Sequence, residues 1–317
     1  MGLMAAVVGV AGSLGLGAEG ANAALKYYRA WNLMERDLQL GLLSDDDEFR
    51  VSEDGARRLV EAQDTVEQLL EASRGGDADW DIAYEEGPGA LLPHLGLMRA
   101  SARVIGADAL RCEESGDHAG AVQRIAALYR MSGDVSHDRI LISSLVGMAI
   151  GNEANKLANH FLDSGVIDAD DAAVLLAATR ELGSGDRFGL RDAIVGEWRM
   201  IAEFLLARAP EEGAGKWLIE IMQMKDDDAL TKKVAAMDKS ALMRELGGWS
   251  AFYSDMLGAW DAGDRARMDA AVERLRDGEY GTLTVVMSAS LTRAFDSNQR
   301  SKEDFRALIE RLEEIGG

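Results

Sequence analysis

The chain has 317 residues, of which 47% are hydrophobic, 6% are aromatic and three are proline. A chain of this length can form one elongated body or two packed subdomains, and the scarcity of proline permits long helices almost everywhere. The net charge of −21 disfavours binding to nucleic acid and to anionic membrane surfaces, because an acidic surface repels phosphate groups. The single cysteine, Cys112, excludes an intrachain disulfide and a cluster of thiolate metal ligands, and it is expected to be a buried or half-buried packing residue.

The N-terminus carries an uncharged segment, residues 3–18, with the sequence LMAAVVGVAGSLGLGA. It is short for a bilayer span, but an apolar stretch followed by small residues, as in Ala21-Asn22-Ala23, is typical of a secretory signal. The basic region that usually precedes such a stretch is missing. We therefore predict that residues 1–23 are a signal, cleaved after Ala23, or a membrane-proximal segment. An ordinary N-terminus is the alternative, so the protein is expected to be exported to the periplasm or the cell exterior, or else to be cytoplasmic.

Gly9, Gly12 and Gly15 in this segment suggest a dinucleotide-binding turn. Such a turn needs a strand before it, a helix after it and an acidic residue about 20 positions later, at the end of a second strand. The following residues have helical spacing instead, so no nucleotide cofactor is expected.

Residues 24–93 are predicted to form an N-terminal helical subdomain with a loop. Apolar residues at helical spacing predict an amphipathic helix over residues 24–43, which the acidic run SDDDE ends. Ser52 is the expected N-cap of the next helix, which continues to Gly75-Gly76. Trp80 and Tyr84, four residues apart, predict a short helix within the following loop.

Residues 94–317 are predicted to form a body of helices separated by Gly, Asp and Ser corners. The most apolar helix, around residues 140–151, is the expected centre of the core. The expected corners are Ser115-Gly116, Ser132-Gly133, Ser164-Gly165, Gly183 to Gly185, Gly213 to Gly215, Asp226 to Asp228, Gly247-Gly248, Gly263 and Gly278.

One corner, SGDHAGAV from Ser115, resembles a tetratricopeptide repeat unit. Gly116 occupies the turn, Ala109 and Ala121 the small positions at which two helices nearly touch, and Ile125 the large apolar position. Asp108, however, stands where such a unit has leucine, and no proline follows Gly133.

The similar stretches at Ala262 and Ser184 do not follow a period of about 34 residues. The predicted fold is therefore all-α, an irregular stack of antiparallel helical hairpins that is TPR-like or α-solenoid-like. The stretch NAALKYYRAW, residues 22–31, also resembles exported, Ala-rich helical proteins of planctomycete-type bacteria, a resemblance that implies no particular activity.

No local motif predicts catalysis, a cofactor or a metal site. His94, His118, His137 and His160 form no metal-binding pair, and the abundance of carboxylates makes any close pair uninformative. A cavity that joined His137 and His160 with several carboxylates would indicate an enzyme.

The aromatic face of one helix is the candidate partner-binding site, although residues at this spacing also suit a core. Its members are Trp249, Phe252, Tyr253, Met256 and Trp260. We predict a non-catalytic protein-interaction or scaffold module, with an acidic rim that favours cationic partners. Membrane contact is expected only through residues 3–18. A structural subunit of a larger assembly and an α-helical enzyme without a local motif are the alternatives.

Overall fold

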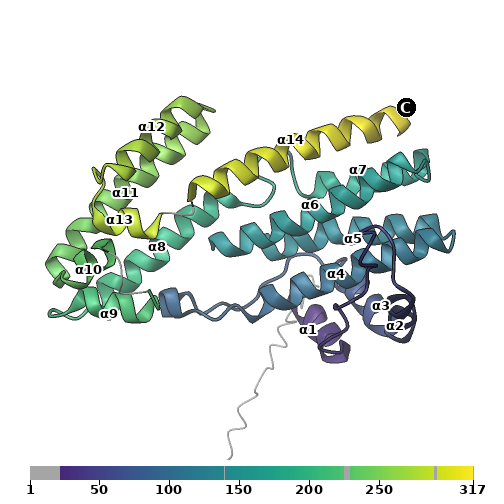
Figure 1. Cartoon of the computed structure of the whole chain (residues 1–317), viewed down its shortest axis with the longest axis horizontal. Coiled ribbons are helices and arrows are strands. Elements are labelled where there is room, and N and C mark those ends of the chain that lie inside the picture. Colours follow the sequence, from purple (N-terminus) through teal and green to yellow (C-terminus); the bar gives the residue numbers. More distant parts are fainter. Residues whose placement is uncertain (1–21, 139, 225–228, 289–290, 317) are drawn as a thin grey trace, which may run out of the picture.

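The computed structural model describes residues 22–138, 140–224, 229–288 and 291–316. These residues form fourteen α-helices, one 3-10 helix and no named strand, so the predicted all-α class is confirmed (Figure 1). Residues 1–21 of the predicted signal or membrane-proximal segment, residues 1–23, lie outside the described residues, as does the predicted corner at Asp226 to Asp228. Asn22 is described as the N-cap of the first helix and Ala23 as its first residue. The helices are α1 (Ala23–Leu33), α2 (Glu53–Glu61), α3 (Gln63–Ala72), η1 (Tyr84–Gly89), α4 (Pro93–Glu114), α5 (His118–Ser136), α6 (Leu141–Asp163), α7 (Ala169–Glu181), α8 (Leu190–Arg208), α9 (Ala214–Ile221), α10 (Ala229–Ala235), α11 (Lys239–Asp261), α12 (Arg265–Arg276), α13 (Thr282–Met287) and α14 (Leu291–Gly316).

The helices form two groups (Figure 1). In the first, α5 packs against α4, α6 and α7, while α14 returns from the end of the chain to pack on α6 and α7. Helices α1, α2 and α3 lie beside α4. In the second group, α11 contacts α8, α9, α12 and α13, and α8 connects this group to α6.

The most apolar predicted helix, α6, contacts α4, α5, α8 and α14 and lies within the first group. The Phe305 ring of α14 packs near Tyr129 of α5 and near Phe188, with centroids 5.7 and 5.8 Å apart. A β-carbon on Gly147 would lie 1.8 Å from Ser136 Oγ, so the lack of a side chain there lets α5 and α6 approach closely. Both sequence-distant and neighbouring helices therefore share this core.

The predicted corner at Ser115-Gly116 is confirmed. Gly116 has φ of +81°, which a residue without a side chain adopts readily, and the backbone N–H of Asp117 donates to the Cys112 carbonyl over 2.8 Å. The Asp117 carboxylate then accepts from the Gly120 N–H at 3.0 Å and caps α5. The turn therefore closes one helix and starts the next.

Asp108, the residue that departs from the repeat pattern, is fully buried between α4 and α5. Its carboxylate accepts from Arg111 at 2.6 Å and from Arg124 of α5. Arg124 also donates to the Gly120 carbonyl. Where a repeat unit has an apolar contact, this chain joins the two helices with a buried ion pair.

The predicted helix over residues 24–43 is wrong in its second half, because α1 ends at Leu33. The guanidinium of Arg58 donates to the carbonyls of Asp37 and Leu40, replacing hydrogen bonds that a helix would have made. Leu38 and Leu42 are nevertheless buried, so their apolar spacing reports burial in an irregular segment.

The helix predicted after Ser52 is two helices, α2 and α3, separated at Ala62, whose φ and ψ of −95° and 17° are not helical. The Ser52 cap itself is confirmed by its bond from the Gly55 N–H at 2.9 Å. Trp80 and Tyr84 do not share a helix, because the Trp80 indole donates to the Asp134 carbonyl and the backbone enters η1 only at Tyr84.

Two predicted corners lie inside helices. Helix α5 continues through Ser132-Gly133, where the Ser132 hydroxyl donates to the Tyr129 carbonyl and therefore needs no turn. Helix α11 continues through Gly247-Gly248. A β-carbon on Gly248 would lie 2.0 Å from the Tyr280 carbonyl oxygen, so this glycine serves close packing.

Candidate functional site

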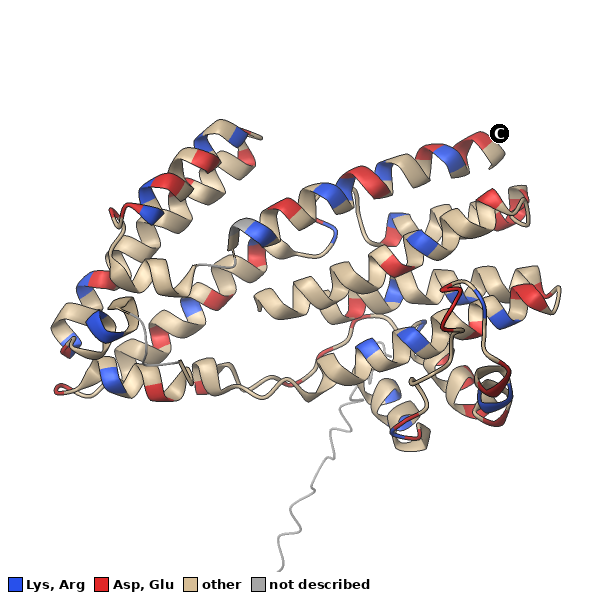
Figure 2. Ribbon diagram, in the orientation of Figure 1, with Lys and Arg blue, Asp and Glu red and all other residues tan. Residues whose placement is uncertain are grey.

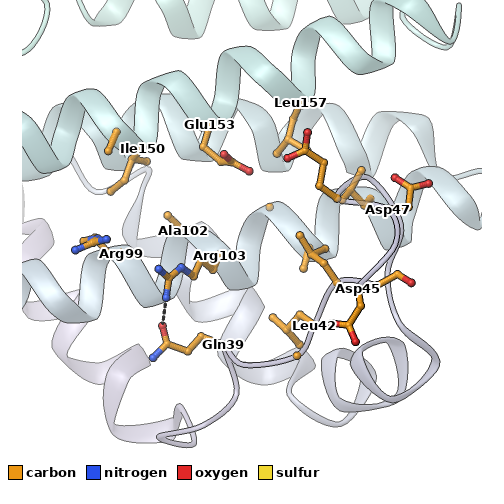
Figure 3. Close-up of a pocket in the computed structure, with 18 of the residues that line it drawn as sticks. Gln39, Leu42, Asp45, Asp47, Arg99, Ala102, Arg103, Ile150, Glu153 and Leu157 are labelled. Carbon is orange, nitrogen blue, oxygen red and sulfur yellow. Dashed lines mark hydrogen bonds between the residues drawn. The ribbon is translucent and has the colours of Figure 1, made fainter. Parts of the chain in front are cut away.

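A groove of about 720 Å³ lies between α4, α6 and the irregular segment of residues 34–51 (Figure 3). We call it the α4–α6 groove. Its apolar lining comprises two exposed residues, Leu43 and Ala149, and a buried set of Leu42, Ala102, Gly106, Ala107, Leu110, Ile150 and Leu157.

Spacing of three and four residues places these side chains on one face of each helix. Arg99, Ala102 and Arg103 follow each other along α4, as Ile150 and Glu153 do along α6 (Figure 3). Beneath the groove the two helices approach closely: a β-carbon on Gly106 would lie 3.5 Å from the Leu157 side chain. The lack of a side chain at Gly106 therefore lets α4 and α6 pack closely beneath the groove.

The irregular segment is attached to α6 and α4 at its C-terminal end. Lys156 pairs with Glu48, and the Phe49 ring stacks on His160 with centroids 4.2 Å apart. The Val51 N–H donates to the Glu114 carboxylate of α4 at 3.1 Å. These contacts hold the acidic run of the segment along one wall of the groove.

The two ends of the groove carry opposite charge. Arg99 and Arg103 lie at one end and Asp45 and Asp47 at the other (Figure 3). Arg103 donates to Gln39 at 3.2 Å, whereas Arg99 has no ion pair within the part of the chain that the structure describes. In Figure 2 the acidic loop beside α4 is the same segment. The groove thus combines an apolar floor with charged side chains that can contact a partner.

The aromatic face predicted as a binding site is placed in the core instead. Trp249, Phe252, Tyr253 and Met256 are at most 7% exposed. Only Trp260 is partly exposed, and its ring packs on Phe295 at 4.4 Å. The helical spacing correctly indicated one shared face, but that face packs against the neighbouring helices of the second group, so it offers no docking surface.

The histidines do not converge. His137 lines a cavity with Arg199, Glu203 and Phe204, whereas His160 lines a separate cavity with asparagines of α6. His94 is buried, with its Nε2 2.8 Å from the Asp138 carboxylate. Among the described residues, His137 and His160 therefore line different cavities and do not form a joint site.

Cys112 is a buried packing residue, as the sequence suggested. Burial raises the pKa of its thiol to about 11. The side chain is therefore protonated at neutral pH and is not an activated nucleophile.

A buried carboxyl that the sequence did not reveal joins α1 to α5. The Tyr27 hydroxyl donates to Asp134 at 2.6 Å. Burial raises the Asp134 pKa to about 7, although the Tyr27 hydrogen bond opposes the rise. Both residues look ordinary in the sequence because they are 107 positions apart, and only the tertiary contact creates their environment.

No protein-family model, curated protein or solved structure matches this chain. Among the described residues, no helix is long and apolar enough to span a bilayer. The same residues include no group of three or more His, Cys, Asp or Glu side chains placed to hold a metal ion.

Proposed function

We propose that this protein is a non-catalytic interaction module that holds a segment of a partner protein in the α4–α6 groove. The observation that carries the proposal is the pairing of an apolar floor with opposite charges at the two ends. Apolar burial supplies affinity, while charge complementarity selects the partner and its direction.

The expected occupant is an amphipathic peptide segment. Its apolar residues would cover the exposed Leu43 and Ala149, its basic residues would meet Asp45 and Asp47, and an acidic residue would meet Arg99 and Arg103. The overall charge of −21 favours partners that are basic elsewhere as well.

The proposal also covers the arrangement of the helices, which we propose to be TPR-like. In a TPR-like array, alternate helices line the concave face, and α4 and α6 are alternate helices on either side of α5 in the chain. Both contribute to the groove. We propose that they perform that role here, in an array without a regular period.

Selection of peptides from a displayed random library against the full chain tests the proposal. Enriched peptides should combine apolar residues with basic residues at one end and an acidic residue at the other. Ala149→Trp should weaken their binding at least about tenfold, because Ala149 is exposed on the groove and tryptophan would occupy it. Arg99→Glu should weaken it less.

Arg276→Glu is the matched control, because Arg276 is exposed on α12 and lies outside the groove. It makes the same charge change and should leave binding unaltered. Failure to enrich any peptide, or equal binding to the wild type and Ala149→Trp, would contradict the proposal.

Export is a separate part of the proposal and rests on residues 1–23 alone. Sequencing the N-terminus of protein from its native cell tests it. A mature chain that begins after Ala23 would agree with export, whereas an intact Met1 would contradict cleavage.

A further inference from the structure

A second cavity, of about 400 Å³, lies between α6 and α14. It involves a different face of α6 from the α4–α6 groove, because the groove uses Ile150, Glu153 and Leu157 whereas this cavity uses three asparagines. Asn152, Asn155 and Asn159 follow each other at spacings of three and four residues and therefore share a face. We call it the asparagine cavity.

The amide oxygens of the three asparagines are used inside the protein, but two of the amide nitrogens are not. The oxygens of Asn152, Asn155 and Asn159 accept from Ser301, Tyr129 and Arg311, respectively. The Asn159 nitrogen donates to the Asn155 carbonyl at 2.9 Å. The side-chain nitrogen of Asn155, a residue only 4% exposed, has no partner among the described residues. None is described for the side-chain nitrogen of the half-buried Asn152 either.

A buried amide donor without an acceptor is costly, so such groups in native proteins are normally satisfied by protein, water or a ligand. The orientation of the two amides is set by the bonds that their oxygens accept. The two amide nitrogens therefore require acceptor oxygens, and no described residue bonds to them.

The charged residues around the cavity indicate which net charge its ligand can carry. Lys156 is paired with Glu48, and Asp163 with Arg311. This leaves Asp304, which has no ion pair among the described residues. An anionic ligand would be repelled by this carboxylate, and a simple cation would not satisfy the amide donors.

A hydroxyl group meets both requirements, because its oxygen accepts from an amide and its hydrogen donates to a carboxylate. The cavity volume is in the range of small-molecule sites. We propose that the asparagine cavity binds a neutral polyhydroxylated molecule of the saccharide class. This site is separate from the proposed protein-binding groove and does not depend on it.

Saturation-transfer NMR on the full chain tests the proposal, with glucose, galactose, mannose, maltose and cellobiose as probes. At least one neutral saccharide should bind, and Asn152→Leu should weaken its binding at least about tenfold by removing an amide donor. Asp304→Asn should weaken it by a smaller factor. Asp304 is exposed, so this variant remains informative if Asn152→Leu does not fold.

Asp277→Asn is the matched control, because Asp277 is an exposed aspartate at the end of α12 and should leave binding unchanged. Glucuronate should bind more weakly than glucose, since its carboxylate faces Asp304. Tighter binding of glucuronate or inorganic phosphate would overturn the proposal. It would equally be overturned if no neutral saccharide bound, which would mean that water alone satisfies the amides.

Discussion

Two of the Gly-Asp corners, after α4 and after α11, share a backbone conformation and differ in their surroundings. At Ser115–Asp117 and at Ala262–Asp264, the N–H of the aspartate donates over 2.8 Å to the carbonyl of the residue five positions earlier. Each aspartate also caps the next helix with a bond of 3.0 Å. Yet α5 is buried along most of its length, whereas α12 buries only Ala271, Val272 and Leu275.

The difference shows that a few local residues specify the turn, while neighbouring helices determine how deeply the next helix is buried. Helix α5 lies against α4, α6 and α7, whereas α12 packs mainly against α11 and α13. The same contrast appears in the polar pairs. Tyr27 donates to the buried Asp134 and Tyr280 to the part-exposed Asp255, both over 2.6 Å.

The largest expected effect comes from Asp108→Leu, which restores the residue of a repeat unit but leaves Arg124 buried without its carboxylate. Removal of one partner from a buried ion pair costs about 3–5 kcal/mol. Urea denaturation should therefore show a large decrease in the free energy of unfolding for Asp108→Leu, whose ion pair joins α4 and α5. The decrease should be much smaller for Asp255→Leu, because its partner on α12, Arg274, is exposed.

The double variant Asp108→Leu with Arg124→Leu is the control, since it removes both charges. It should recover part of the stability lost in the single variant. Equal losses at Asp108 and Asp255 would show that burial does not distinguish the two corners.

The next largest effect is a pH dependence of the free energy of unfolding, caused by Asp134. Because its pKa in the folded state is raised to about 7, the folded chain retains a proton that the unfolded chain releases near pH 4. This contribution is most favourable at low pH and is lost as the pH rises to about 7, by at most about 4 kcal/mol. Asp77 and Glu181 reinforce the raised pKa, and Arg130 opposes it.

Asp134→Asn can still accept the Tyr27 hydrogen bond and cannot ionise. Its free energy of unfolding, relative to wild type, should increase between pH 5 and pH 8 in denaturant titrations. Asp255→Asn should not reproduce this change, since Asp255 is partly exposed. A parallel pH profile for wild type and Asp134→Asn would contradict the assignment.

Removal of the helix cap should lower stability by a similar amount at both corners, and by less than the changes at Asp108 and Asp134. Asp117→Ala and Asp264→Ala each remove one side-chain bond to a backbone N–H, which costs about 1 kcal/mol. Thermal unfolding of the two variants measures this loss of stability. A loss at Asp117 several times that at Asp264 would mean that the cap depends on helix burial rather than on the turn alone.

The smallest effect is expected at Arg265, whose side chain pairs with Asp269 and Asp296 in solvent. Exposed pairs contribute about 0–1 kcal/mol. Arg265→Gln should lower stability by less than about 0.5 kcal/mol at low salt and should have no measurable effect at high salt. A loss that persisted in high salt would indicate packing rather than charge.

The sequence predicted the features that depend on nearby residues. These include the all-α class, the cap at Ser52, the corner at Ser115-Gly116 and the burial of Cys112. It failed where a distant residue supplied the hydrogen bonds or the packing surface, as Arg58 does for the segment after α1 and Tyr280 does for Gly248.

The candidate sites were less predictable than the helices. Arg99 and Asp45 form one groove only because segment 34–51 is held against α6. The asparagines of α6 were visible as a periodic set, but their unused nitrogens depend on partners as distant as Ser301, 149 residues away. The spacing of Trp249 and Phe252 marks a shared face without saying whether water or protein covers it.

The return of α14 to α6 and α7 has a consequence for how the chain matures. Phe305, Ser301 and Arg311 complete a core whose other members were synthesised about 150 residues earlier. During translation, α5 and α6 are therefore synthesised before α14, and the part of their apolar surface that α14 covers stays exposed until α14 is made. A chain that is truncated before α14 would therefore expose the apolar surface that α14 covers on α6 and α7, and we expect it to aggregate.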